Sequence, residues 1–261
     1  MLSLRGAVRG RDLRAGAGGA GGGGGGFDKD TIAGLEAWYD AEDADTITGT
    51  TDLVSQWDDK SDSGNHVLAA GAQRPSQVTV NSLNAIRFNA AEQLQKASPV
   101  ACDGPDITIF AVINKQYDEA DSWPGVINRS NTGWSTGWRL SSGAADGSEM
   151  SFSAAGYITD VVQITSTPTG ADAFHLLSAD HEDAGGVKNG YLNNVFVGSD
   201  TSGLIAGASA NAMSVGTADT ATAYVLMGSV GEILIYNSVL SAEDRLTVAT
   251  YLAAKWGITL P

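Results

Sequence analysis

The main part of the chain alternates between short apolar segments and polar turns. The apolar segments have a period of two residues or form brief runs rich in β-branched and aromatic residues, which is typical of β-strands. The predicted strands are Leu35–Tyr39, Leu53–Trp57, Ala85–Phe88, Ile107–Ile113, Gly125–Ile127, Trp138–Leu140, Met150–Phe152, Ile158–Ile164, Phe174–Ala179, Val187–Leu192, Val195–Val197 and a long pair within Ala223–Tyr236. Because the segments are joined by turns and not by helices, we expect an all-β fold, an antiparallel β-sandwich.

One helix is predicted near the C-terminus. Ser241 is the expected N-cap, and Asp244 occupies the capping-box position three residues later. Gly257 stands where a glycine in the left-handed conformation would end the helix. The apolar positions that recur at helical spacing are Leu246, Ala249, Ala253 and Trp256. We expect this helix to be structural and to pack across one end or face of the sandwich.

Composition indicates one folded domain, residues 27–261. Of the 261 residues, 43% are apolar and 17% are charged, and the formal net charge is −15. The acidic balance excludes binding to a nucleic-acid backbone, which needs a basic face. Cys102 is the sole cysteine, which rules out an intrachain disulfide and a cysteine-based zinc site. No long apolar run predicts insertion into a membrane, and no secretory signal is recognised at the start.

Residues 1–26 have a different composition. They hold 11 of the 33 glycines and four arginines, Arg5, Arg9, Arg11 and Arg14, against one acidic residue, Asp12. Poly-glycine favours a flexible tether. A basic arm attached to an acidic domain suggests an anchor that docks on a partner, and a leader without a role is an equal alternative.

Several segments resemble a known domain family. They are residues 34–40, 54–61, 64–66, 85–89 and 190–194, together with the C-terminal stretch that runs from Gly231-Glu-Ile-Leu-Ile-Tyr-Asn237 to Tyr251-Leu-Ala-Ala-Lys-Trp-Gly257. This set is similar to the laminin-G-like, concanavalin A-like jelly-roll domains of bacteriophage structural proteins and large bacterial surface proteins. The resemblance implies a jelly roll. It leaves the function open, because this fold hosts lectins, glucanases, adhesion modules and inert virion parts.

Patterns for catalysis are weak. Residues 133–137 match the nucleophile-elbow pattern around Ser135, with His175 and His181 downstream as conceivable bases. An elbow needs a helix directly after the serine, whereas the residues from Trp138 onward predict a strand. The paired-carboxylate pattern of a retaining glycosidase is also missing. We therefore expect a protein that is not an enzyme.

Acidic residues gather in two clusters, Asp40, Glu42, Asp43 and Asp45, and Asp58, Asp59 and Asp62. Calcium needs six to eight oxygen ligands, and no EF-hand spacing is present. Solvated turns are the favoured interpretation, calcium is the alternative, and no other cofactor is expected.

The stretch from residue 117 to residue 134 has the strongest ligand-binding character. Asp118, Trp123, Asn131 and Trp134 place two aromatic rings among acid and amide groups on an expected long loop. Sugars stack on such rings and pair their hydroxyls with Asn or Asp. In the alternative interpretation the tryptophans bury against the sandwich edge or a neighbouring subunit.

These observations predict a non-enzymatic phage virion structural protein, a fibre, tail-tip or head-surface component. Its arm would dock on other virion proteins and copies of itself, and its jelly roll would project outward, with host-surface glycans as a further partner. A carbohydrate-binding module of a bacterial surface or secreted protein is the alternative. A glycoside hydrolase is the least favoured reading.

Overall fold

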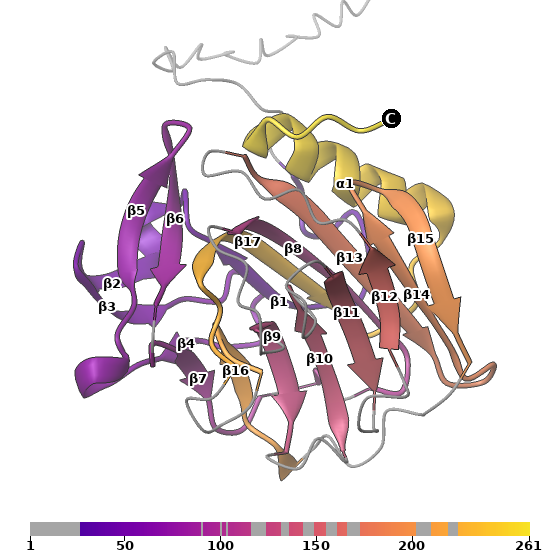
Figure 1. Ribbon diagram of the computed structural model, residues 1–261, viewed down its shortest axis with the longest axis horizontal. Coiled ribbons are helices and arrows are strands. Elements are labelled where there is room, and N and C mark those ends of the chain that lie inside the picture. The colour runs from indigo at the N-terminus through magenta and orange to yellow at the C-terminus, as the bar shows by residue number, and fades with distance from the viewer. Residues whose placement is uncertain are drawn as a thin grey trace, which may run out of the picture.

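The computed structural model is a sandwich of two antiparallel sheets with one helix on its outside (Figure 1). It describes residues 27–89, 91–99, 101–102, 104–115, 124–131, 136–142, 149–154, 161–165, 173–201, 210–218 and 224–261. The arm of residues 1–26 therefore lies outside the described residues.

The first sheet, sheet A, has eight strands in the order β15-β14-β13-β8-β17-β6-β5, and β1 also pairs with β17. Its strands are β1 (Leu35–Asp40), β5 (Ser76–Val80), β6 (Leu83–Phe88), β8 (Ile107–Lys115), β13 (His175–Glu182), β14 (Val187–Leu192), β15 (Val195–Asp200) and β17 (Gly228–Tyr236). The two nine-residue strands β8 and β17 are adjacent and buried along their whole length, so they form the centre of the fold.

The second sheet, sheet B, has nine strands in the order β12-β11-β10-β9-β16-β7-β4-β3-β2. Its strands are β2 (Ile47–Thr50), β3 (Leu53–Trp57), β4 (Val67–Leu68), β7 (Leu94–Lys96), β9 (Gly125–Ser130), β10 (Gly137–Ser141), β11 (Glu149–Ala154), β12 (Val161–Thr165) and β16 (Met213–Val215). Two single turns of 3-10 helix, Ala44–Thr46 and Gly71–Gln73, lie between strands that precede β8 in the sequence.

The predicted antiparallel sandwich with a C-terminal helix is confirmed, and two details of the sequence prediction are wrong. The long pair of strands expected within residues 223–236 is a single strand, β17, and Val225 forms only isolated bridges to Gly125 and Thr217. Short strands such as β4 and β16 were also not predicted. With two or three residues each, they are too short for alternation to show in a sequence.

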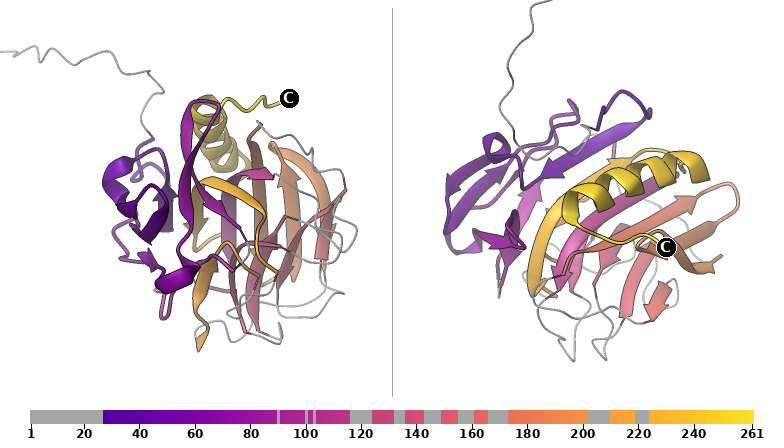
Figure 2. Two further views of the ribbon diagram at one scale, coloured as in Figure 1. Left: turned by 60° about the vertical axis from the view of Figure 1, so that its left-hand side comes forward. Right: turned by 90° about the horizontal axis from the view of Figure 1, so that it is seen from above.

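Two apolar clusters lie on opposite sides of sheet A. Trp57, Phe88 and Trp138 belong to the core between the sheets. The second cluster lies on the outer face of sheet A, under helix α1 (Ala242–Trp256), and it unites Phe110 and Leu234 of the sheet with the buried face of the helix. Figure 2 shows α1 on the outside of the sandwich. The centre of sheet A is therefore buried on both faces, which explains why all nine positions of β8 and of β17 are buried.

Helix α1 begins and ends as its sequence predicts. The Ser241 side chain accepts a hydrogen bond from the backbone N–H of Asp244 at 3.1 Å, and Gly257 ends the helix with a φ of 68°. One predicted core position is wrong, because Leu246 is 50% exposed. Val248 and Leu252 occupy the buried face instead.

A buried carboxylate joins α1 to sheet A. Glu232 of β17 is fully buried, and its two oxygens accept hydrogen bonds from four side chains. The donors are Trp38 Nε1 at 2.7 Å, Tyr251 OH at 2.7 Å, Lys255 Nζ at 2.8 Å and Trp256 Nε1 at 2.7 Å. Three of these four donors come from α1, so the carboxylate fixes where the helix lies on the sheet.

A second carboxylate extends this network. Asp40 of β1 lies directly opposite Glu232 in the register, and Lys255 Nζ also contacts Asp40 Oδ1 at 2.5 Å. Lys60 Nζ contacts the other oxygen of Asp40 at 3.0 Å. Burial raises the pKa of Glu232, the charge of Asp40 raises it further, and Lys255 opposes both effects. The lysine thus links two acidic side chains that would otherwise repel each other across neighbouring strands.

Trp256 packs where β17 has no side chain. A Cβ atom built on Gly231 would lie 2.6 Å from the Trp256 ring, so only glycine leaves room for the indole. Phe174 completes the pocket with its ring centroid 4.7 Å from that of Trp256. The glycine and the tryptophan are 25 positions apart in the sequence but form one packing unit.

We predict that Trp256→Ala lowers the free energy of unfolding by about 3–5 kcal/mol, because it empties this pocket and removes one donor of Glu232. Gly231→Ala should also destabilise the protein, by about 1–3 kcal/mol of overpacking, and this cost should shrink in the Trp256→Ala background. Urea titration of the two single variants and the double variant measures the coupling.

Leu246→Ala is the matched control on the same helix, because an exposed side chain contributes within about 0.5 kcal/mol. If the loss of unfolding free energy in the double variant equals the sum of the losses in the two single variants, the Trp256 ring does not occupy the space above Gly231.

Candidate functional site

The predicted glycan-binding stretch is described only in part. Asp118, Trp123 and Trp134 lie outside the described residues, and their roles stay predictions. Asn131 follows β9, and its Oδ1 accepts a hydrogen bond from the backbone N–H of Thr136 at 3.2 Å. Asn211 Nδ2 donates to Thr136 Oγ1 at 3.0 Å. Asn131 therefore belongs to a half-buried polar cluster at the end of the β9–β10 pair.

A row of polar side chains crosses sheet B beside this cluster, and the sequence patterns did not reveal it. Its members are Gln95, Ser214, Asn128 and Arg139, which lie side by side on β7, β16, β9 and β10. Their strand neighbours Leu94, Ile127, Leu140 and Val215 belong to the core, so the row lies on the opposite face of the sheet.

This row is largely buried. Gln95 is half-buried and donates from Nε2 to Ser214 Oγ at 3.1 Å, whereas Ser214, Asn128 and Arg139 are each buried. Amide, hydroxyl and guanidinium groups are the partners that sugar hydroxyls use. The strand alternation would have indicated this polar face, but only once the pairing of strands far apart in the sequence was known.

The second acidic cluster is a structural turn. Asp59 Oδ1 accepts hydrogen bonds from the backbone N–H groups of Trp38 at 2.9 Å and Ser61 at 2.8 Å. Asp59 Oδ2 accepts from Ser61 Oγ and from the backbone N–H of Asn65, both at 2.9 Å. This carboxylate joins its own turn to β1, and because Asp59 is buried the predicted solvated turn is wrong for this residue.

The first acidic cluster is engaged by lysines. Lys60 Nζ lies 2.6 Å from Asp43 Oδ2 and 3.0 Å from Asp40 Oδ2, and its contact lowers the pKa of Asp43. Within the described ranges, no three His, Cys, Asp or Glu side chains gather in a way that could hold a metal ion. A calcium site stays a prediction that these contacts do not support.

The two histidines suggested as bases occupy opposite ends of β13. Ser135, the serine of the elbow pattern, lies outside the described residues. His181 Nδ1 lies 2.5 Å from the carbonyl oxygen of Pro105. His175 is 7% exposed, and its ring nitrogens have no hydrogen-bond partner among the described residues. Both imidazoles are therefore placed as buried sheet residues.

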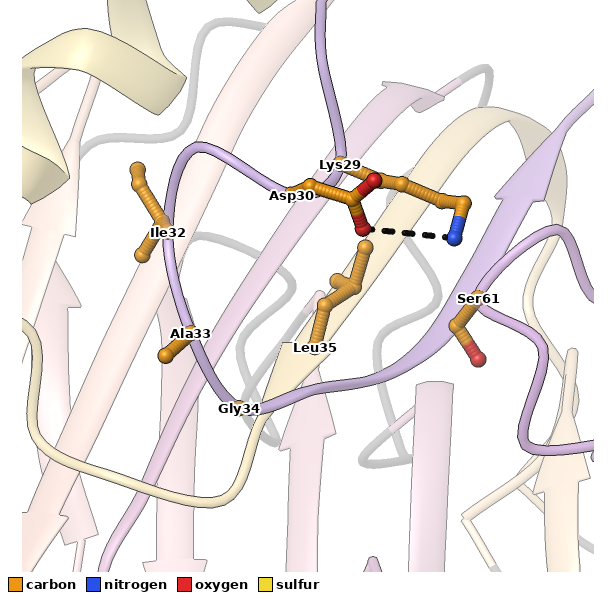
Figure 3. Close-up of a pocket in the computed structure, with 7 residues that line it drawn as sticks. All are labelled: Lys29, Asp30, Ile32, Ala33, Gly34, Leu35 and Ser61. Carbon is orange, nitrogen blue, oxygen red and sulfur yellow. Dashed lines mark hydrogen bonds and ion pairs between the residues drawn. The ribbon is translucent and has the colours of Figure 1, made fainter.

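A small polar depression lies where the chain enters β1 (Figure 3). Its volume is about 210 Å³, and its lining residues are Lys29, Asp30, Ile32, Ala33, Gly34, Leu35 and Ser61. Lys29 Nζ contacts the carboxylates of Asp30 and Asp62, so its charge is balanced within the protein. The depression is smaller than the roughly 300 Å³ at which ligand pockets begin.

Comparison with known proteins identifies the fold. No family model matches the sequence, and no curated protein matches it either. Domain 4 of an extracellular arabinanase from Geobacillus stearothermophilus, solved in complex with arabinotriose, is similar over 83% of this chain and 98% of its own, with a TM-score of 0.52 and 12% identity. The receptor-binding domain of a botulinum neurotoxin C/D mosaic serotype is similar over 85% of this chain and 52% of its own, with a TM-score of 0.57 and 13% identity.

A third similar structure is larger. Trypanosoma rangeli sialidase in complex with sialic acid is similar over 86% of this chain, with a TM-score of 0.59 and 12% identity, but the chain spans only 33% of that enzyme. At these identities the likeness establishes the β-sandwich, jelly-roll-like fold and nothing finer. Among the described residues, no helix has the length and apolar composition needed to cross a membrane.

We predict that His175 lowers the free energy of unfolding of the protein as the pH falls. Burial lowers the pKa of His175 from its ordinary value of 6.5. As pH falls through 6.5, the unfolded chain takes up a proton that the folded chain accepts only at lower pH, so protonation favours unfolding. Relative to His175→Leu, the native protein should lose free energy of unfolding between about pH 7 and pH 5 in urea titrations. If the free energy of unfolding changes with pH in the same way in the native protein and in His175→Leu, the pKa of His175 is the same in the folded and the unfolded state, and the prediction is wrong.

Proposed function

We propose that this chain is a non-enzymatic carbohydrate-binding β-sandwich module displayed on a bacteriophage particle as a fibre, tail-tip or head-surface component. The observation that carries the proposal is the near whole-to-whole correspondence with a domain solved in complex with arabinotriose. The phage setting comes from the sequence, namely the resemblance of its opening and C-terminal segments and the basic glycine-rich arm.

The placement of the buried carboxylates supports a binding role over hydrolysis. A glycosidase needs two carboxyl groups about 5–10 Å apart on either side of an open cleft. Glu232 and Asp40 are opposite each other on neighbouring strands, but both are buried and both bind Lys255. Asp59 is occupied by hydrogen bonds from Trp38 of β1 and from its own turn. These three carboxylates of the described residues are therefore engaged in structural contacts, which agrees with a binding role.

The attachment of the arm supports display. Phe27, the first described residue, stacks on Tyr251 of α1 with ring centroids 4.8 Å apart and meets Trp38 edge-on at 5.6 Å. The exit point of residues 1–26 is thus held against the flank of α1 that faces β1. A docked arm would hold the sandwich by this flank, with other virion proteins and copies of the chain as partners. A module of a bacterial surface or secreted protein is the second candidate, because the fold serves both.

We predict that deletion of residues 1–26 abolishes incorporation into particles while the melting temperature stays unchanged, because the contacts of the two apolar clusters are all made by residues from Phe27 onward. Quantitative mass spectrometry of purified particles gives the copy number. Replacing Arg5, Arg9, Arg11 and Arg14 by glutamine keeps the length of the arm and removes its positive charge. This variant therefore separates the contribution of the charge to docking from that of the length. Normal copy numbers for the deletion variant would overturn docking through the arm.

We predict that Trp123→Ala and Trp134→Ala each weaken adsorption to glycans without changing the melting temperature, because each indole would offer a stacking face. Binding should be measured on assembled particles or on tetramers of the biotinylated chain, since single-site affinity is modest and linked copies raise it. Trp→Phe variants keep a ring and should retain partial binding. If both Trp→Ala variants adsorb like the parent, the loop has a structural role and does not bind the glycan.

A further inference from the structure

We propose that the outer face of sheet A beside α1 carries a subsite for a neutral pyranose sugar, formed by Phe196 and Tyr191 with Asn189, Asp180 and Arg245. We refer to these five residues as the β14–β15 shelf. The inference rests on the proposed carbohydrate binding and assigns it to a second place on the fold, away from residues 117–134.

The shelf lies where α1 stops covering sheet A. The apolar cluster under the helix includes residues of β1, β8, β13 and β17 but none of β14 or β15. These two strands form the edge of sheet A beside α1 (Figure 1). Phe196 is 56% exposed there, and Val187 and Asn189 of β14 lie on the same face as its partner Tyr191. An exposed aromatic ring therefore lies at the border between the helix and an open strip of sheet.

The ring of Phe196 is held in place by its neighbours. Phe196 pairs with Tyr191 across β14 and β15, and their ring centroids are 5.7 Å apart at an interplanar angle of 64°. The Arg245 guanidinium lies over the Tyr191 ring at 4.1 Å from its centroid. This stack orders the platform before a ligand arrives, which lowers the entropy cost of binding.

Polar groups surround the platform on the side of β13. Asn189 Nδ2 donates to Asp180 Oδ1 at 2.7 Å, which orients the amide. Arg245 Nη1 lies 4.0 Å from Asp180 Oδ2, longer than a hydrogen bond. Arg245 Nε is buried and makes no hydrogen bond to any described residue. The guanidinium is thus held by stacking and charge, and the Arg245 side chain is 18% exposed beside the platform.

The tyrosine of the shelf is engaged within the protein. Burial, together with the charge of Asp180, raises the pKa of Tyr191 to about 12, and its hydroxyl is hydrogen-bonded to the Asp180 side chain. A sugar could lie with a C–H face on Phe196 and pair neighbouring hydroxyls with Asn189 and Arg245. Both kinds of contact are needed to orient a pyranose.

The charge of the surroundings selects a neutral ligand. The chain carries a formal net charge of −15, and the one cation of the shelf is already shared with Asp180. An anionic sugar would meet repulsion from the domain and compete with that carboxylate. A protein partner would be favoured by a broad apolar patch, whereas here a single exposed ring is bordered by polar side chains.

The test is an NMR titration of the full chain, labelled at the leucine and valine methyl groups, with three neutral probes and one anionic probe. The neutral probes are methyl α-D-glucopyranoside, methyl α-D-mannopyranoside and methyl β-D-galactopyranoside, and the anionic probe is N-acetylneuraminic acid. We expect the methyl resonances of Val187, which lies on the same face of β14 as Asn189 and Tyr191, to shift with at least one neutral probe at about 10 mM, the range of a weak single site.

Phe196→Ala should weaken this binding at least tenfold and leave the melting temperature unchanged, and Asn189→Ala should also weaken it. Leu68→Ala is the matched control, because it removes a 49% exposed apolar side chain from sheet B. Its binding should equal that of the parent.

The outcomes separate the two proposals. If a neutral probe shifts methyl groups elsewhere but not those of Val187, or if Phe196→Ala binds like the parent, the shelf is wrong while carbohydrate binding stands. Shifts at Val187 with the anionic probe alone, or on raising the protein concentration without sugar, would also overturn the shelf. If neither the methyl glycosides nor glycan adsorption by tetramers shows binding, both proposals fail.

Discussion

The structure depends on the burial of one carboxylate. Glu232 lies in the middle of the central strand of sheet A with no exposure to solvent, and an unpaired charge there would cost several kcal/mol. Its hydrogen bonds to Tyr251, Lys255 and Trp256 join the sheet to α1. The helix therefore has two roles: it supplies hydrogen bonds to Glu232, and it covers the apolar outer surface of sheet A. Without the helix, the carboxylate would lose these donors and the apolar surface would be exposed.

The fixed position of α1 divides the outer face of sheet A into two flanks. On the flank toward β1, Phe27 stacks on Tyr251 and holds the exit point of the arm. On the flank toward β14, Arg245 covers Tyr191, and Phe196 remains exposed. Docking and recognition would thus use opposite sides of one helix. A rigid helix between them suits a module that is held at one side and presents a ligand-binding surface at the other.

Local signals allowed much of the fold to be predicted from the sequence. The cap of α1 follows from Ser241 and Asp244, and the turn between β14 and β15 follows from Asn193 and Asn194, whose φ values of 48° and 64° suit asparagine. The sequence could not reveal which residues from separate elements contact each other in the fold. Glu232 reads as the polar position of an alternating strand, and nothing near it indicates that Lys255 will bury it.

The same limit explains the candidate sites. The prediction at residues 117–134 used aromatic and polar residues that are close in sequence, and of its members only Asn131 lies within the described ranges. The β14–β15 shelf was not predicted, because Asp180, Tyr191 and Arg245 come from three separate elements. Sequence patterns reveal sites formed within one loop better than sites formed by strand pairing and a helix docked on them.

The central claim is that the buried Glu232 makes the helix and the sheet one cooperative unit. Native-state amide hydrogen exchange tests it most directly, because it resolves the opening free energy of each element. The account predicts that the amides of residues 248–253 in α1 exchange with the same free energy as those of β8 and β17, through global unfolding alone. Exchange of the α1 amides at a clearly lower free energy, with the strands still protected, would show that the helix detaches independently and would contradict the account.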